Sequence, residues 1–302
     1  MADTQTRAGF VAILGAPNVG KSTLMNRMVS AKVSIVSPKV QTTRTRVIGI
    51  CMKGNSQIIF IDTPGIFKPK RRLDRAMVAA AWGGNKDADL TMLLIDAERG
   101  VDANTDAIIK RLKKMGRKII LVLNKVDLLK KPALLALAEK LSDEDIFTNI
   151  FMVSAQTGDG VDDLTAFLAG KMPEGPWLYP EDQVSDMPMR LLAAEITREQ
   201  IYLQLHQELP YAATVETENW TEQPDGSHRV EQVIYVERPG QKGIVLGKGG
   251  ARIKAIGAAA RAELEDVVDG RVHLFLFVKV RENWADDPER YRDWSLDFNA
   301  PE

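Results

Sequence analysis

One segment, Gly15-Ala16-Pro17-Asn18-Val19-Gly20-Lys21-Ser22, determines how the first half of this 302-residue chain is expected to fold. It matches the pattern G-x-x-x-x-G-K-S and follows the apolar run Phe10–Leu14, which predicts a buried strand that turns through glycines into a helix. Glycines permit a tight turn that aims consecutive backbone N–H groups into one concavity, and the helix N-terminus adds a positive dipole end. We therefore predict a phosphate-binding loop, in which Lys21 reaches the β- and γ-phosphates and the Ser22 hydroxyl binds Mg²⁺. An ordinary Gly-rich surface turn is the alternative, but all four fixed positions match at a strand–helix junction.

A second segment, Asn124-Lys125-Val126-Asp127, indicates which nucleotide base the site would bind. It follows the apolar run Ile119–Leu123. A carboxylate at Asp127 can accept from both N1–H and the N2 amino group of guanine, whereas adenine offers neither donor in that arrangement. We expect Asn124 to bind the base and tie this segment to the phosphate loop, and the Lys125 stem to lie over the purine face. Because the wrong base leaves such an acceptor unpaired, discrimination of ~10⁴–10⁵ is attainable. Alone, N-K-x-D often marks only a polar turn; behind a phosphate loop it predicts a guanine nucleotide.

Two further segments end predicted strands. Asp62-Thr63-Pro64-Gly65 follows the strand Gln57–Ile61; Asp62 is expected to hold Mg²⁺ through a water, and the Gly65 N–H to contact the γ-phosphate. Ser154 and Ala155 follow the strand Ile150–Val153, and the Ala155 N–H can donate to guanine O6.

A threonine that closes over Mg²⁺ and the γ-phosphate is expected between the first helix and Asp62. The polar stretch 39–44 supplies Thr42 and Thr43, of which we favour Thr43. Both can equally be surface loop residues. Ile66 stands where Ras-like enzymes place the glutamine that orients the attacking water. Since isoleucine cannot hydrogen-bond to water, we expect intrinsic hydrolysis to be slow or supported from elsewhere, and no general base is identified.

Composition predicts a soluble, intracellular protein, and we expect a cytoplasmic monomer. The net charge of −1 gives no global attraction to nucleic acid or membrane. The single cysteine, Cys51, excludes an internal disulfide and lies in an apolar strand, where a buried core role is expected. Residues 1–7 lack the apolar core of a signal peptide, and no apolar run approaches the ~18 residues of a membrane span.

Residues 1–175 alternate between strand-like and helix-like segments, which predicts an α/β fold with a mostly parallel sheet flanked by helices. Ligand loops are then expected at the carboxyl ends of the strands. Prolines mark residues 176–188 as a linker. The expected strands are Phe10–Leu14, Val47–Met52, Gln57–Ile61, Leu90–Ile95, Lys118–Leu123 and Ile150–Val153, and the helices lie near Lys21–Val29, Asp74–Trp82, Thr105–Met115, Pro132–Leu141 and Val161–Lys171.

Residues 189–285 follow a different order, helix–strand–strand–helix–helix–strand, and residues 286–302 form a tail. Gly247-Lys248-Gly249-Gly250 lies between the last two helices. A G-x-x-G loop there predicts an α+β domain of the type II KH class, whose loop clamps an RNA backbone. Lys242, Arg252 and Lys254 are candidate phosphate contacts, and we expect Ile244, Val245, Ile253 and Ile256 to line a floor under unstacked bases.

Charge is unevenly distributed, with 26 Lys and Arg against 18 Asp and Glu in residues 1–180 and 14 against 23 in residues 181–302. The acidic second part argues against RNA, but residues 238–262 contain six Lys and Arg and no Asp or Glu. Since affinity for phosphates depends on where the cations lie, the local pattern is decisive. A degenerate fold that binds only protein is the alternative.

These motifs together resemble the Era family of bacterial ribosome-assembly GTPases, from Gly9 to about Asp287. The specific marks are residues 15–22, 41–44, 62–65, 124–127, 240–250 and 284–287. The resemblance implies hydrolysis of GTP to GDP, coupled to binding near the 3′ end of small-subunit (16S) ribosomal RNA during maturation of the small ribosomal subunit. It also implies loose, peripheral association with the inner membrane, for which the sequence shows no segment.

Asn18 offers a route around the missing glutamine. In related GTPases an asparagine at this loop position helps to bind K⁺ beside the phosphates, where a cation stabilises charge on the transferring group. The alternative is that Asn18 only shapes the loop through hydrogen bonds to the backbone.

Three other classes of protein fit the sequence less well. A signalling GTPase that grips a protein effector would need no G-x-x-G loop. A metabolic P-loop kinase or ATPase is opposed by Asp127, and a tandem GTPase is opposed by the single phosphate loop.

Overall fold

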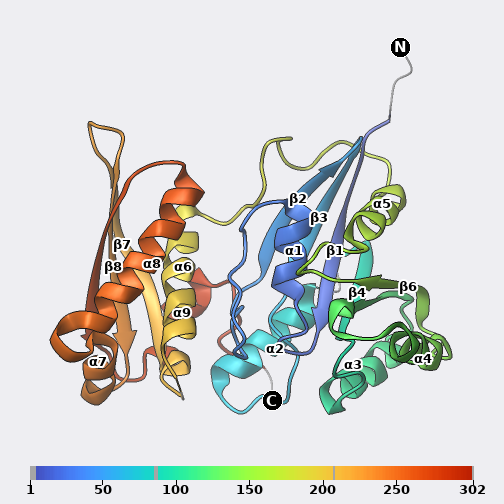
Figure 1. Cartoon of the computed structure of the whole chain (residues 1–302), viewed down its shortest axis with the longest axis horizontal. Helices are drawn as coiled ribbons and strands as arrows, with labels where there is room; N and C mark the ends of the chain where they lie inside the picture. Colours follow the sequence, from blue (N-terminus) through green and yellow to red (C-terminus); the bar gives the residue numbers. More distant parts are fainter. Residues whose placement is uncertain (1–4, 85–87, 207, 301–302) are drawn as a thin grey trace. The chain divides into compact units, whose positions relative to one another are not determined.

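The computed structural model describes residues 5–84, 88–206 and 208–300. The chain divides into two compact units. The N-terminal unit contains Met1–Ser34, Thr43–Asp186 and Tyr291–Glu302, and the C-terminal unit contains Ile35–Thr42 and Met187–Arg290. Each unit has its own sheet (Figure 1).

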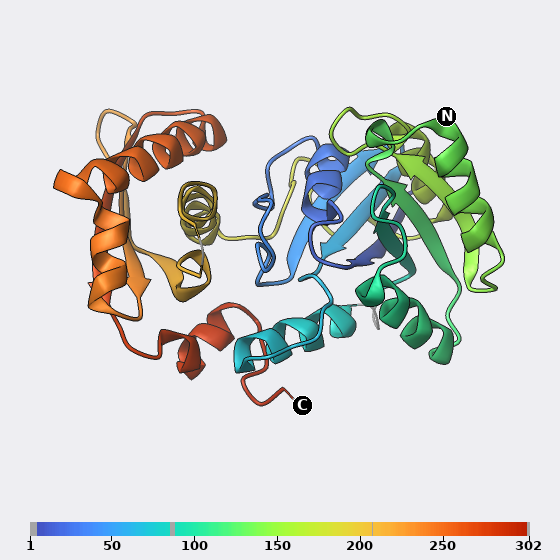
Figure 2. The ribbon, with the colours of Figure 1, turned by 60° about the horizontal axis from the view of Figure 1, so that its bottom comes forward.

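The N-terminal unit is built on a six-stranded sheet in the order β2-β3-β1-β4-β5-β6. Every neighbouring pair is parallel except β2 and β3, which are antiparallel. Figure 2 shows helices α1 and α5 on one face of the sheet and α2 and α3 on the other. The strands are β1 (Arg7–Gly15), β2 (Val47–Lys53), β3 (Ser56–Asp62), β4 (Leu90–Asp96), β5 (Ile119–Asn124) and β6 (Phe147–Val153), and the helices are α1 (Lys21–Val29), α2 (Arg72–Gly84), α3 (Ala103–Lys114), α4 (Lys131–Ser142) and α5 (Val161–Lys171).

Continuous apolar sequence explains why these strands occupy the centre of the sheet. All residues of β3 and β5 are buried, because helices cover both faces. The parallel strands β1, β3, β4, β5 and β6 therefore bring their carboxyl ends to one edge. The last residues of four of them, Gly15, Asp62, Asn124 and Val153, begin or directly precede the predicted nucleotide motifs.

The predicted linker 176–188 is, over most of its length, a strap bound to the N-terminal unit. The Gln57 side chain accepts from the N–H groups of Leu178 and Tyr179, at 2.8 and 3.0 Å. The Ile50 N–H donates to Val184 O at 2.9 Å. Since Gln57 is fully buried, its amide needs these partners. The change from one unit to the other falls between Asp186 and Met187.

The C-terminal unit has the expected helix–strand–strand–helix–helix–strand order. Its sheet has the order β7-β8-β9, with β7 and β8 antiparallel and β8 and β9 parallel. One cluster of its core joins Ile201, Ile234, Val245, Ile256 and Val278, which come from three helices and two strands. The elements are α6 (Met189–Gln204), β7 (Ala213–Glu222), β8 (His228–Val236), α7 (Pro239–Leu246), α8 (Ala251–Val268) and β9 (Val272–Val280), and a short helix, α9 (Pro288–Asp293), lies in the expected tail.

The predicted floor for RNA bases is wrong in part. Val245 and Ile256 are fully buried in the core, and Ile253 packs against that core. The physical reason is helical periodicity, which turns these positions of α7 and α8 towards the sheet. Ile244 alone of the four has an exposed side chain, at 48%.

Residues 35–42, expected in the first domain, pack instead with the C-terminal unit. The Val36 N–H donates to Glu199 Oε1 at 2.6 Å, and Lys39 Nζ donates to Leu205 O at 2.7 Å and to Tyr202 O. The last carbonyl groups of a helix lack partners within the helix and carry the negative dipole end. The C-terminus of α6 therefore attracts a lysine.

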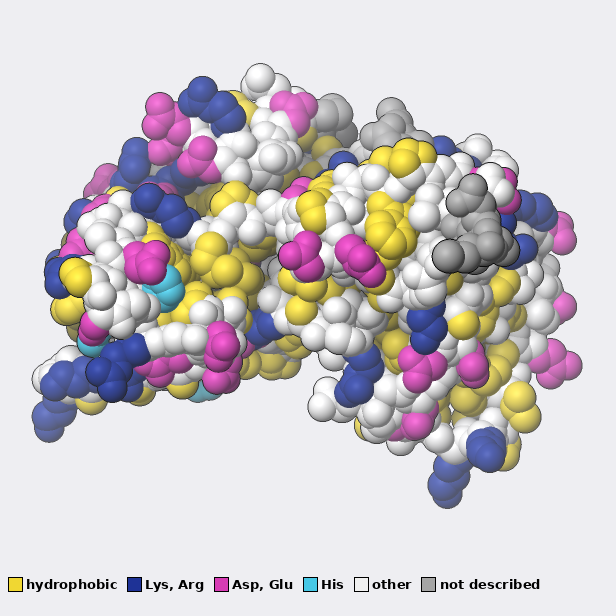
Figure 3. All heavy atoms as spheres, turned by 90° about the horizontal axis from the view of Figure 1, so that it is seen from above, with side chains coloured by type: hydrophobic (Ala, Val, Ile, Leu, Met, Phe, Trp, Pro, Cys, Tyr) yellow, Lys and Arg dark blue, Asp and Glu magenta, His cyan; other side chains and the backbone are white. Residues whose placement is uncertain are grey.

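Charged side chains of both signs lie at the surface. On the face drawn in Figure 3, Lys and Arg side chains are interspersed with Asp and Glu, in keeping with the net charge of −1. None of the helices within residues 5–84, 88–206 and 208–300 has the length and apolar character needed to cross a membrane.

Candidate functional site

The predicted phosphate loop lies between β1 and α1. Asn18 and Gly20 have left-handed φ values of 64° and 94°, which turn the chain sharply into α1 at Lys21. Lys21 Nζ lies 3.3 Å from Gly15 O and 3.1 Å from Ala16 O, and so closes the loop. Burial lowers the pKa of the Lys21 ammonium to about 8, and the negative charge of Asp62 opposes that shift. A phosphate group bound here would add negative charge beside the buried ammonium and would raise its pKa.

Three oxygen-bearing side chains converge beside this loop. Ser22 Oγ lies 2.6 Å from Asp62 Oδ2 and 3.0 Å from Thr43 Oγ1. The hydroxyl groups of Ser22 and Thr43 thus lie within hydrogen-bond distance of each other, and both also bond to the Asp62 carboxylate. The Thr42 hydroxyl instead donates to Lys39 O at 2.8 Å. The geometry therefore favours Thr43 over Thr42 as the predicted metal ligand.

Asp62 provides a test of whether Mg²⁺ fits these residues. Its carboxylate is fully buried, and Oδ1 has no hydrogen-bond partner among the residues described. Burial raises the pKa of Asp62, against the charge of Lys21 and hydrogen bonds from Ser22, Ser34 and Thr43. A carboxylate and two hydroxyl groups form an oxygen donor set, which suits Mg²⁺. Such an ion, or its water, would satisfy the orphaned oxygen.

The segment after Asp62 packs against the phosphate loop. The Thr63 hydroxyl donates to Ile13 O at 2.9 Å, and the Ile66 N–H donates to Gly15 O at 3.1 Å. A Cβ atom on Gly65 would lie 3.0 Å from Pro17 Cα, so the close approach favours glycine. The side chain of Ile66 is buried. Position 66 thus holds the loop in place by its backbone and offers no polar group.

Asn124 joins the three segments that would surround a nucleotide. Its Nδ2 donates to Val19 O at 2.8 Å, and its Oδ1 accepts from the Ala155 N–H at 2.9 Å. A Cβ on Gly20 would approach Asn124 Nδ2 to 2.3 Å, so only glycine admits this bridge. The predicted tie to the phosphate loop is present. The Ala155 N–H, predicted to donate to guanine O6, is bonded to Asn124 in this structure.

Lys125 is held by a carboxylate that sequence reasoning missed. Lys125 Nζ lies 2.6 Å from Asp96 Oδ2, and the Asp96 side chain is only 2% exposed. Asp96 ends β4, and an acidic residue at the carboxyl end of a buried strand is the signal that was available. Asp127 is exposed in the short 3₁₀ turn Val126–Leu128, where its carboxylate remains accessible to a base.

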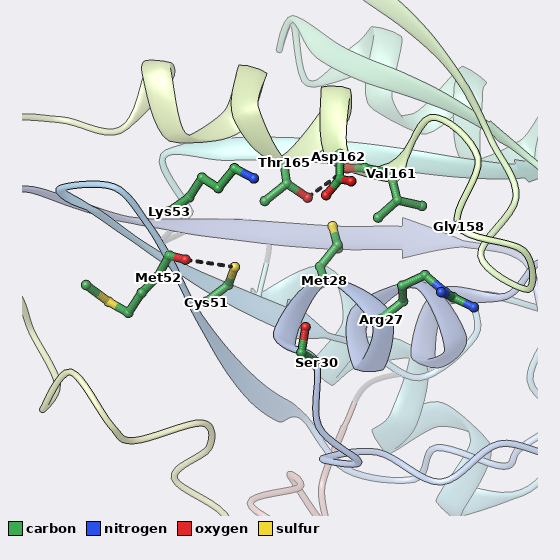
Figure 4. A pocket seen from close by; sticks show the side chains of 10 residues that line it. All are labelled: Arg27, Met28, Ser30, Cys51, Met52, Lys53, Gly158, Val161, Asp162 and Thr165. Carbon is green, nitrogen blue, oxygen red and sulfur yellow. Dashed lines mark hydrogen bonds between the residues drawn. The ribbon is translucent and has the colours of Figure 1, made fainter.

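The loop after β6 is supported by Arg27. Its guanidinium donates to Ala155 O at 2.8 Å and to Gln156 O at 2.5 Å. Arg27 also lines a pocket of about 330 Å³ between α1, β2 and α5, shown in Figure 4, in which Cys51 forms part of the wall. Cys51 is buried, and burial raises the pKa of its thiol. Ser154, the other predicted residue of this loop, is fully buried, and its Oγ accepts from the Thr157 N–H at 3.1 Å.

The G-x-x-G loop joins α7 and α8 at the surface of the C-terminal unit. Gly247, Gly249 and Gly250 have positive φ values of 71°, 59° and 77°, which favour glycine at these positions. Lys248, Arg252 and Lys254 are exposed, and Lys242 is half-buried. The Arg252 guanidinium donates to Ile244 O at 3.1 Å and so also braces the end of α7.

A shallow groove of about 310 Å³ lies beside this loop. Gly247, Lys248 and Arg252 line one part of it, and Ala251 and Ala255 of α8 provide small apolar surface. Gln204, at the end of α6, completes the lining and was not among the predicted residues. The groove thus combines cations, small side chains and an amide, which suits a polynucleotide backbone with its bases.

Comparison with known protein families matches both units. Residues 10–125 match the model described as 50S ribosome-binding GTPase, and residues 208–285 match the KH domain. The chain is 63% identical over 293 residues to GTPase Era of Rhizobium meliloti (strain 1021), covering 97% of this chain and 94% of the relative. It is 61% identical over 295 residues to GTPase Era of Brucella suis biovar 1 (strain 1330), covering 98% and 95%.

Two solved structures are similar over nearly the whole chain. One is a point variant of Aquifex aeolicus Era bound to GDP·AlF₄⁻, and the other is Era in complex with MgGDPNP and nucleotides 1506–1542 of 16S ribosomal RNA. Each has a TM-score of 0.90 and 38% sequence identity, with 95% of this chain and 98% of the other covered.

Proposed function

The chain belongs to the Era family of GTPases, and we propose that it couples its GTPase cycle to maturation of the small ribosomal subunit. The observation that carries this proposal is the presence, in one chain, of a guanine-type nucleotide site and a basic G-x-x-G loop beside a groove. The relative solved with nucleotides 1506–1542 of 16S ribosomal RNA indicates the class of target. We therefore assign binding near the 3′ end of the small-subunit RNA to the C-terminal unit.

In the nucleotide site, this chain's residues bind and orient the phosphates. Lys21 Nζ, now bonded to the carbonyl groups of Gly15 and Ala16, would exchange them for oxygens of the β- and γ-phosphates. Ser22, Thr43 and Asp62 would hold Mg²⁺, which supplies charge neutralisation on the phosphates when it is bound. The fixed contact between the Ile66 N–H and Gly15 O keeps Gly65 against the phosphate loop, where its N–H can reach a terminal phosphate.

Crosslinking the full-length protein to RNA in cells, followed by sequencing of the attached fragments, tests this proposal. We expect fragments from near the 3′ end of the small-subunit ribosomal RNA to be enriched over other abundant RNAs. A folded protein that binds GTP but yields no enriched RNA would contradict the proposal and favour a protein effector. The family assignment would survive that result, because the nucleotide site is separate from the RNA loop.

We further propose that K⁺ assists hydrolysis at Asn18, whose left-handed φ of 64° sets its place in the phosphate loop. Replacing K⁺ with Na⁺ should slow turnover by about tenfold or more, because a well-placed cation stabilises charge on the transferring group. In Asn18→Ala, the two salts should give nearly the same low rate. Steady-state GTP hydrolysis at equal ionic strength measures both effects. Equal wild-type rates in the two salts would remove K⁺ from the mechanism and leave the GTPase assignment intact.

We propose a cytoplasmic monomer that associates peripherally with the inner membrane. Cell fractionation with and without a high-salt wash tests the association, because a peripheral protein should be released from the membrane fraction by salt. Light scattering of the purified protein tests the monomer.

A further inference from the structure

Ser34 occupies a position next to the proposed metal site. Its side chain is almost fully buried, at 3% exposed, and its hydroxyl donates to Asp62 Oδ2 at 3.1 Å. The same carboxylate oxygen accepts from Ser22 Oγ at 2.6 Å. Ser34 therefore adds a hydroxyl donor, besides Ser22 and Thr43, to the carboxylate that is expected to hold Mg²⁺.

The backbone of Ser34 is fixed by the side chain of Asn26 in α1. Asn26 Oδ1 accepts from the N–H groups of Val33 and Ser34, at 3.1 and 3.0 Å. Asn26 Nδ2 donates to Ser34 O at 2.7 Å. One amide thus uses both its acceptor and its donor on the same short segment, and this fixes the backbone from which the Ser34 hydroxyl reaches Asp62.

Ser34 is also the residue at which the chain leaves the N-terminal unit. Residues 35–42 pack with the C-terminal unit, and the chain returns at Thr43. Both ends of this excursion carry a hydroxyl at the proposed metal site, because Thr43 Oγ1 lies 3.0 Å from Ser22 Oγ. The two residues that border residues 35–42 thus each place a hydroxyl group beside the proposed metal site.

We infer that Ser34 is a positioning residue for Asp62, and that Asn26 acts through it. When Ser22 turns its oxygen towards Mg²⁺, Ser34 keeps its donated hydrogen bond and holds the Asp62 carboxylate in the orientation that the hydrated ion needs. This inference rests on the proposed use of Mg²⁺ with the nucleotide. It concerns metal-dependent retention of nucleotide and is separate from any role in RNA binding.

Release of a fluorescent GDP analogue from the full-length protein, followed over a titration of free Mg²⁺, tests the inference. In Ser34→Ala, the Mg²⁺ concentration that half-maximally slows release should rise about 10-fold, the effect of losing one hydrogen bond to a charged group. Release in excess EDTA should stay within about twofold of wild type, because the lost contact acts through the ion. Ser34→Thr retains the hydroxyl and should restore the wild-type midpoint.

Ser56→Ala is the matched control. Ser56 is also a buried serine of the N-terminal unit with one side-chain hydrogen bond, from its Oγ to Ala169 O at 2.9 Å. It lies at the start of β3, whereas Asp62 lies at the end. Its loss should leave the Mg²⁺ midpoint unchanged.

An Asn26→Ala variant should shift the midpoint in the same direction, and Asn26→Ala/Ser34→Ala should shift it no further than Ser34→Ala alone. Shifts that multiply would overturn the claim that Asn26 acts through Ser34. A Ser34→Ala midpoint equal to wild type would overturn the positioning role, as would equally faster release at every Mg²⁺ concentration, including EDTA. If nucleotide release from the wild type did not depend on Mg²⁺, the proposed use of Mg²⁺ would be contradicted instead. The experiment therefore distinguishes failure of the Ser34 inference from failure of the proposed cofactor.

Discussion

Asp127→Asn should lose affinity for GTP by about 10²–10⁴-fold and gain affinity for xanthosine triphosphate. The exposed Asp127 carboxylate would accept two hydrogen bonds from guanine, each a contact to a charged group. An amide presents its own N–H₂ group to the N2 amino group of guanine, so donor meets donor. Xanthine carries an oxygen at that position, which accepts from the amide. Equilibrium competition between the two nucleotides against a fluorescent GDP analogue measures the change.

The control for this variant is Asp143→Asn, which makes the same chemical change on an exposed carboxylate at the C-terminus of α4. This residue lies away from the loops that carry the nucleotide motifs, so its nucleotide affinities should match wild type. An Asp127→Asn protein that binds GTP normally and rejects xanthosine triphosphate would show that Asp127 does not read the base. Adenine nucleotides should bind neither variant, because no other predicted contact recognises adenine.

The convergence of the candidate nucleotide segments could be predicted because each segment is recognisable from its local sequence. Gly15–Ser22, Asp62 and Asn124 each follow a run of apolar residues, and parallel strands bring such segments to one edge without further information. The motif itself predicts glycine at position 20, but the structural cause lies far along the chain. A Cβ on Gly20 would approach the Asn124 amide to 2.3 Å.

Asp96, Ser34 and Arg27 were missed because their partners are distant in the sequence. Asp96 is an acidic residue at the end of a strand, and nothing in the sequence pairs it with Lys125. Ser34 belongs to an irregular segment with no periodic pattern, and only the folded chain places it at Asp62. Tertiary contacts of this kind complete the site, and local sequence does not reveal them.

The course of the chain between the units was also beyond prediction from sequence. The prolines of residues 176–188 correctly indicate an irregular segment, but a buried glutamine, Gln57, decides that this segment binds along β3. In the same way, residues 35–42 carry no pattern that identifies α6 as their partner. The bonds from Lys39 to the end of α6 depend on where that helix ends.

Lys248→Asp/Gly249→Asp should lower the affinity for RNA by about 10²–10³-fold at physiological salt and leave GTP binding unchanged. The two substitutions put carboxylates where phosphates of the backbone must lie, so repulsion replaces attraction. Gly249 has a φ of 59°, and a Cβ there meets nothing within 4 Å, so aspartate is accommodated with only local strain. RNA and GTP binding are measured on the same preparation, and circular dichroism checks the fold.

The matched control, Lys279→Asp/Gly226→Asp, makes the same change in charge elsewhere in the C-terminal unit. Lys279 is exposed in β9, and Gly226 has a φ of 78° with open space around its missing Cβ. If the loop holds the RNA, this control should lose little affinity, whereas equal losses in both proteins would indicate a general charge effect. A single Lys248→Ala change should weaken RNA binding less than the double substitution does. The slope of log K against the logarithm of the salt concentration should become shallower by about 0.7, the value for one lost phosphate contact on a single strand. A folded Lys248→Asp/Gly249→Asp protein with wild-type affinity for RNA would refute the assignment of this loop. That result would favour the alternative in which the C-terminal unit recognises a protein effector.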